Sequence, residues 1–198
     1  MAFIILGILA LIAGIVLQKN EQVAPFAKVA RLVAVLLIIV GVLTKSVVQI
    51  NAGQIGVKTS FGKVQNDVLH SGLHFINPLM EVLSLDIKTQ NYTMSGVQDE
   101  GNRSADDAIR VLTADGLEVT IDLTVLYKLL PSEAPKLVRE TGEDYKDKIV
   151  RPLTRTKIRD NSVYYDAVSL YSSKRDEFQQ RIFKSIEDDF KKRGLILE

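Results

Sequence analysis

The two histidines of the chain, His70 and His74, are the residues whose type and spacing could do chemistry. Two imidazoles four residues apart on a helix can bind one metal ion. Here, however, Ser71 and Gly72 lie between them and Pro78 follows, and glycine and proline both weaken a helix interior. Without a helix the spacing loses its meaning, so it does not support a metal site.

Acidic residues gather in the segment QDEGNRSADD (98–107), which contains Asp99, Glu100, Asp106 and Asp107. These residues lack the regular ligand spacing of a calcium loop. The abundance of Gly, Asn, Ser and Asp is typical of a solvated loop, and that is the structure we expect.

Motifs of the common enzyme classes do not occur. The sequence has no P-loop, no dinucleotide fingerprint, no GxSxG and no HExxH. It has no cysteine, which excludes a thiolate metal site, a cysteine nucleophile and a disulfide framework. We therefore predict no catalytic, cofactor-binding or metal-binding residues, and a protein that is not an enzyme.

The charges are balanced, with 25 basic and 24 acidic residues. A protein that binds nucleic acid usually carries a basic excess, so nucleic acid is not an expected partner. The apolar residues, in contrast, are concentrated in the first fifty positions.

Two apolar runs fill this N-terminal part. The first, AFIILGILALIAGIVL (2–17), has no polar residue, and as a helix it would span about 24 Å, slightly less than a hydrocarbon core of about 30 Å. Local thinning of the bilayer can compensate for the difference. The second run is centred on residues 32–43 and extends to 29–48 if Arg31 snorkels to the surface. We predict a membrane anchor in residues 1–48, with two hydrophobic helices at 2–17 and 29–48.

Three alternatives for the anchor remain open. A cleaved signal peptide would need a basic N-terminal region and a small-residue cleavage site, and the first run has neither. A pair of buried core helices would not explain the lack of any polar face. One membrane span with one interfacial segment is the third.

Topology is also undecided by the sequence. Lys19, Lys28 and Arg31 in the join between the runs favour a cytoplasmic join under the positive-inside rule. The opposite orientation is favoured by the lysines after the second run, Lys45, Lys58 and Lys63.

Strand patterns begin after the second run. QIGVKTSFGKV (54–64) predicts a half-buried hairpin that turns at Gly62, and EVLSLDIKT (81–89) alternates apolar and polar residues. LEVTIDLTVLYKL (117–129) alternates along most of its length and follows the hairpin turn residues Asp115 and Gly116. We expect one antiparallel sheet of about four strands.

Helices are predicted in the last third of the chain, at 143–161 and 172–194. In the second, Ser172 or Ser173 is the expected N-cap and Gly194 the expected stop. Its apolar residues repeat every four positions and form a stripe that must be buried: Phe178, Ile182, Ile186 and Phe190. Strands followed by helices define an α+β domain, with helices covering the sheet.

Several segments together resemble the SPFH or Band 7 superfamily, which includes stomatin, prohibitin, flotillin and HflK/C. The resemblance is strongest to the prohibitin-like branch. The segments are VQINAGQIGVKTSFGKV, SGLHFINPLMEVLSLDIKTQ, TADGLEVTIDLTVLYKL, GEDYKDKIVRPLTRTKIRD and SSKRDEFQQRIFKSIEDDFKKRGLIL. The resemblance implies an SPFH domain at 49–198. It also implies that SGLHFINP is a turn and strand returning to the membrane-proximal face, with Gly72 in the turn, His74 and Phe75 in the strand, and Pro78 at its exit.

The resemblance further implies a non-enzymatic membrane scaffold that self-associates and organises lipids or client membrane proteins. The alternative is a regulatory partner of a membrane-bound ATP-dependent protease. The expected location is a membrane, in particular a bacterial inner membrane.

Family members usually continue into a long coiled coil beyond the equivalent of Leu197, and that coiled coil is absent from this sequence. We expect either a fragment of a longer protein or assembly through the membrane segment and the domain flanks. Gly7 and Gly14 would then permit close helix approach.

Overall fold

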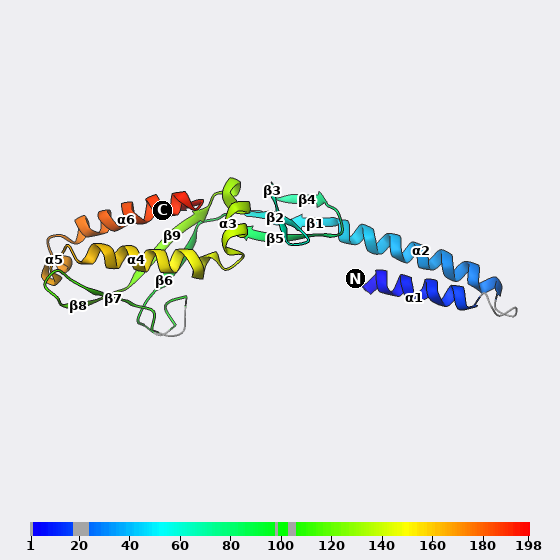
Figure 1. Cartoon of the computed structure of the whole chain (residues 1–198), viewed down its shortest axis with the longest axis horizontal. Helices are drawn as coiled ribbons and strands as arrows, with labels where there is room; N and C mark the ends of the chain where they lie inside the picture. Colours follow the sequence, from blue (N-terminus) through cyan, green and yellow to red (C-terminus); the bar gives the residue numbers. More distant parts are fainter. Residues whose placement is uncertain (1, 18–23, 98, 103–105) are drawn as a thin grey trace.

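The helix pair at the N-terminus and the body of the domain lie at opposite ends of an elongated molecule (Figure 1). The computed structural model describes residues 2–17, 24–97, 99–102 and 106–198. Helix α1 (Ala2–Leu17) has the predicted bounds. Helix α2 (Ala24–Ser46) begins earlier than predicted, because Pro25 is tolerated in a first helical turn, and ends earlier because Val47 starts a strand.

Helices α1 and α2 run antiparallel, side by side (Figure 1). Gly7 permits their close approach, since a Cβ atom at this position would lie 2.6 Å from Ile38 Cγ1 and 3.1 Å from the Ala34 carbonyl oxygen. Ala34 is completely buried in the contact. The surroundings of Gly14 lie outside the described side chains.

The strands of the described residues form four antiparallel sheets: β1–β4, β3–β2–β5, β7–β8 and β10–β9–β6. Their bounds are β1 (Val47–Ile50), β2 (Gln54–Ser60), β3 (Lys63–Leu69), β4 (Gly72–Phe75), β5 (Met80–Asp86), β6 (Gln90–Met94), β7 (Ile109–Leu112), β8 (Glu118–Ile121), β9 (Leu123–Leu129) and β10 (Leu195–Leu197).

The expectation of one sheet is therefore wrong. The alternating run 117–129 is divided at Asp122, whose carboxylate accepts a hydrogen bond from the Gly96 N–H at 3.0 Å. The segment between β6 and β7 leaves the sheet here, so β8 pairs with β7 and β9 pairs with β6. Both hairpins predicted from turn residues are confirmed, at Gly62 between β2 and β3 and at Gly116 between β7 and β8.

The helices of the body are α3 (Ala134–Thr141), α4 (Arg151–Ser162), α5 (Ala167–Tyr171) and α6 (Arg175–Lys192), with a 3-10 turn η1 (Pro131–Glu133) and a π-helical turn η2 (Lys146–Val150). The apolar stripe of α6 is buried as predicted, and Phe190 meets Tyr127 of β9 edge to face, with ring centroids 6.2 Å apart. Gly194 follows the end of α6 with φ +76°, as expected for a helix stop.

The predicted N-cap of α6 is wrong. The residue before the helix is Lys174, and no side chain caps it. The Ser172 hydroxyl instead donates to the Val168 carbonyl oxygen of α5, at 2.7 Å. The short helix α5 thus uses the serine that the sequence pattern assigned to α6.

An ion pair joins the two long helices of the body. Asp189 of α6 lies 2.8 Å from Lys157 of α4 and 2.8 Å from Lys192, and these two hydrogen bonds lower its pKa from 3.8 to about 2. A carboxyl group whose pKa is lowered by folding stabilises the protein above its unfolded pKa, and this stabilisation is lost as the pH falls through the folded pKa.

We predict that Asp189→Asn lowers the free energy of unfolding by about 1 kcal/mol at pH 7. This value is smaller than the pKa shift alone would give, because Asp189 is partly exposed and solvent screens its ion pairs. The difference from the native protein should shrink between pH 4 and pH 2. Denaturant titrations across this range measure it, with Asp188→Asn as a control of equal charge at an exposed position. A constant difference at all these pH values would contradict the role of the ion pair.

Candidate membrane-facing surface and buried ion-pair network

The outer faces of the helix pair are apolar and exposed. In α2, the stretch Lys28–Ser46 has 19 residues and a mean hydropathy of 2.1, and is long and apolar enough to cross a membrane. The exposed large apolar residues are Ile5, Leu6, Ile8, Leu9, Ile12 and Ile15 of α1, and Val29, Leu32, Val33, Val35, Leu36, Ile39, Val40, Val42 and Leu43 of α2. A continuous apolar surface of this kind is unfavourable in water and suits lipid.

Strand register fixes which part of the domain adjoins this helix pair. β1 follows α2 with no residue between them and points away from it, whereas β4 points back toward it (Figure 1). Phe75 at the end of β4 pairs with Val47, and the Ile76 N–H donates to the Ser46 carbonyl oxygen at 2.7 Å. The turn after β4 therefore lies at the end of α2.

The turn after β2 lies at the same end. β2 belongs to the β3–β2–β5 sheet and runs antiparallel to β5, and its last residue, Ser60, pairs with Met80, the first residue of β5. Residues 61–62 and 76–79 are consequently neighbours at the helix end of the domain. This brings together segments that the sequence separates.

Exposed apolar side chains occupy these turns and the outer face of β4. We call Phe61, Leu73, Phe75 and Leu79 the membrane-facing rim; their exposed fractions are 87, 62, 77 and 65%. Lys45 and Lys63 beside them are also exposed. Aromatic and aliphatic side chains next to lysines suit the boundary between lipid headgroups and acyl chains.

Both histidines lie next to the rim, but as structural residues. The segment forms β4, with Gly72 at φ +134°, and the predicted absence of a helix is confirmed. His74 Nε2 donates to the His70 carbonyl oxygen at 2.6 Å. The imidazole thus links β4 to the residue before the turn. His74 and Phe75 lie in the strand, as the resemblance implied, whereas Gly72 is the first residue of the strand.

The acidic segment 98–107 is only partly as predicted. Asp99 is exposed, Asp106 forms an exposed ion pair with Arg110 at 2.6 Å, and Glu100 accepts a hydrogen bond from Ser95 at 2.9 Å. Residues 98 and 103–105 lie outside the described residues. Asp107 contradicts the prediction of a solvated loop, because only 3% of it is exposed.

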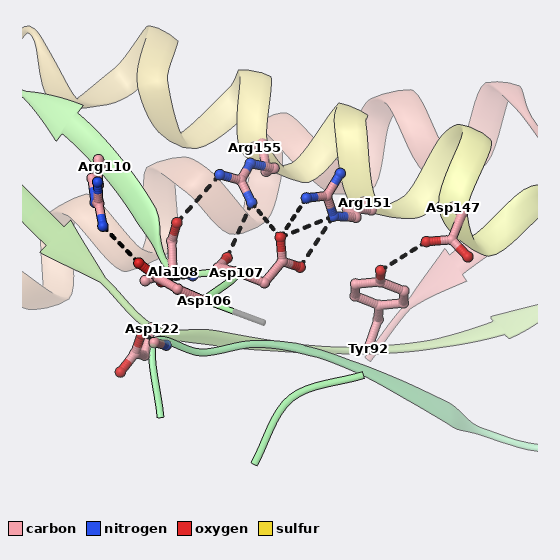
Figure 2. A network of polar contacts seen from close by, with 10 residues as sticks. Tyr92, Asp106, Asp107, Ala108, Arg110, Asp122, Asp147, Arg151 and Arg155 are labelled. Atoms are coloured by element: carbon pink, nitrogen blue, oxygen red, sulfur yellow. Dashed lines mark hydrogen bonds and ion pairs between the residues drawn. The ribbon is translucent and has the colours of Figure 1, made fainter. Parts of the chain in front are cut away.

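Asp107 is buried because two arginines of α4 neutralise it (Figure 2). Arg151 Nε lies 3.1 and 3.0 Å from the two carboxylate oxygens, and its Nη2 also donates to Oδ1. Arg155 Nη1 donates to Oδ1 at 2.7 Å and to the Asp107 carbonyl oxygen at 3.0 Å, and its Nη2 donates to the Ala108 carbonyl oxygen at 3.2 Å. The hydrogen bonds that Arg151 donates to Asp107 raise the pKa of Arg151.

This network has a structural role. It ties the start of β7 to α4, and the Tyr92 hydroxyl adds a hydrogen bond from β6 to Asp147 at 3.0 Å (Figure 2). Sequence reasoning missed it. The spacing of Arg151 and Arg155, four apart and so on one helix face, was the available sign, but it did not identify the partner.

Groups of three or more histidine, cysteine, aspartate or glutamate residues that could hold a metal ion do not occur among the described residues.

An apolar helix pair that continues without a linker into an α+β domain, with an apolar rim at the junction, defines a membrane-associated domain protein. The family model for the SPFH domain / Band 7 family matches residues 48–198, and the chain belongs to this family. Proteins of this family are generally membrane-associated, oligomeric and non-enzymatic scaffolds. A search of curated proteins gave no significant match.

Proposed function

We propose that this protein is a non-enzymatic, prohibitin-like scaffold of a bacterial inner membrane. Residues 1–48 act as its anchor, and the SPFH domain at 49–198 self-associates and organises lipids or client membrane proteins. The direct connection of α2 to β1, with the exposed rim around it, is the observation that carries the proposal.

The length of α2 supports an anchor that crosses the membrane. Lys28–Ser46 is about 28 Å long as a helix, close to the thickness of a hydrocarbon core. Arg31 lies one turn inside Lys28, within reach of the far surface by snorkelling. Since α1 and α2 are antiparallel, the start of α1 and the domain would lie on the same side of a membrane that both helices crossed.

The absence of a linker supports a scaffold role. A domain joined to its membrane helix by a flexible segment can tilt freely, whereas here β1 pairs with β4 immediately after α2 ends. Copies anchored in one membrane would share an orientation, and confinement in the bilayer would raise their effective concentration. Both conditions favour side-by-side association of like surfaces.

Crosslinking in native membranes, followed by identification of the adducts, tests the scaffold role. We expect adducts between copies of the protein together with lipid and several membrane proteins. Recovery of one membrane protease at fixed stoichiometry would favour the alternative, a dedicated regulator of an ATP-dependent protease. Recovery of the protein only as a monomer would contradict both functions.

We predict that the rim enters the headgroup region. A tryptophan in place of Phe75, in the otherwise native chain reconstituted in vesicles, should be quenched strongly by lipids brominated near the top of the acyl chain, because the rim is held at the membrane surface. Tyr171→Trp is the matched control, since Tyr171 is 73% exposed on α5 at the far end of the body (Figure 1). Equal quenching at both positions would contradict the proposed orientation.

A further inference from the structure

The long strand formed by β8 and β9 has two edges that differ in pairing. One edge is paired along its length, by β7 against β8 and by β6 against β9. On the other edge, β10 pairs with Tyr127, Lys128 and Leu129, and the Glu198 N–H adds one bond to the Leu126 carbonyl oxygen at 2.9 Å. Among the described residues, no strand pairs with this edge from Ile121 to Val125.

Alternation of hydrogen bonds shows which main-chain groups face this open edge. In an antiparallel pair, every second residue directs its N–H and C=O to the same neighbour. Leu130 and Leu126 bond on the side of β10. Thr124 is the next residue in this series, so its N–H and C=O point to the open edge. Its side chain meets Thr93 of β6, with the two hydroxyl oxygens 2.9 Å apart, as expected for a pair that exchanges no main-chain bonds.

An apolar groove of about 320 Å³ lies along the same edge. Its strand wall includes Ile121, Leu123 and Val125, its helix wall includes Phe178 and Phe183 of α6, and Leu197 of β10 forms its end. Phe183 is 42% exposed. The lining thus joins the end of β10, at Leu197 and Glu198, to the unpaired stretch from Ile121 to Val125.

We propose that this edge and groove form a docking site for one extended peptide strand of a partner polypeptide, antiparallel to β9 and in line with β10. A strand satisfies both features at once, because its main chain can bond to Thr124 while its side chains fill the groove. A lipid would fill the groove only. The site also lies in the body of the domain, away from the helix pair (Figure 1).

The register set by β10 defines the chemistry of the occupant. Residues directly opposite one another on paired strands share a face of the sheet. Val125 is buried and Leu123 packs against the core, so the residues opposite them should be apolar. The residue opposite Thr124 should carry a polar side chain and needs a free N–H. The site therefore takes peptides that alternate apolar and polar residues.

Hydrogen exchange at the Thr124 amide tests the proposal. The full chain in lipid nanodiscs is titrated with a synthetic heptapeptide of alternating valine and threonine. We expect saturable protection, with exchange at the Thr124 amide slowed at least tenfold. The control peptide carries proline in place of the residue opposite Thr124, and it should bind more weakly and give less protection, because proline has no N–H to donate to the Thr124 carbonyl oxygen.

Variants locate the binding. Phe183→Asp should abolish protection, because it places a charge in the groove wall, whereas Val168→Asp, at a position 74% exposed on α5, should leave it unchanged. Equal protection by the two peptides would overturn strand pairing. A further variant carries the heptapeptide sequence fused after Glu198. Protection of the Thr124 amide in this fused variant alone, and not by the free peptide, would overturn docking of a partner. Lack of protection in every experiment would also overturn it.

Discussion

Replacing Leu36 and Ile39 together by lysine is expected to release the protein from membranes during an alkaline carbonate wash. Both residues lie near the middle of Lys28–Ser46, with exposed fractions of 55 and 53%. A lysine near the centre of a membrane helix costs about 2.5–3.5 kcal/mol, so the two substitutions together should cost about 5–7 kcal/mol. This is enough to shift α2 from a membrane-spanning to a released state.

The measurement is the fraction of protein that remains in the membrane pellet. The native chain and a Leu36→Ala, Ile39→Ala variant should both remain there, because alanine shortens the side chains without adding charge. Release of the native chain would show that α2 does not span the membrane. Full retention of the lysine variant would mean that the attachment depends on α1 or on the rim.

Replacing Asp107 by alanine is expected to lower the free energy of unfolding by about 3 kcal/mol. The substitution leaves Arg151 and Arg155 without the carboxylate that neutralises them in a largely buried site (Figure 2). Both guanidinium groups keep some exposure, with side-chain exposed fractions of 25 and 19%, which moderates the cost. Thermal unfolding in detergent should show a midpoint lower by about 6–12 °C.

Asp106 provides a control next to Asp107 in the sequence. Its ion pair with Arg110 is exposed, so Asp106→Ala should cost less than about 1 kcal/mol. Asp107→Asn should fall between the two, since the amide keeps one acceptor and loses the charge. Similar small effects of Asp106→Ala and Asp107→Ala would indicate that both residues lie in a solvated loop.

The sequence alone determined the features that depend on local pattern. The bounds of α1, the β2–β3 hairpin at Gly62, the turn at Gly116 and the buried stripe of α6 all follow from residue periodicity and turn chemistry. These signals lie within a few residues of one another, so no knowledge of distant partners is needed. The same is true of the segments that match the SPFH domain / Band 7 family.

Tertiary structure decided the features that depend on partners far away in the chain. Asp107 is buried only because α4 brings Arg151, 44 residues later, against it, whereas its neighbour Asp106 stays exposed. The division at Asp122 depends on Gly96, and the rim exists because strand pairing brings Phe61 and Phe75 to the end of α2. Burial, neutralisation and strand pairing are relations between residues, and a local pattern identifies one member of such a relation but not the other.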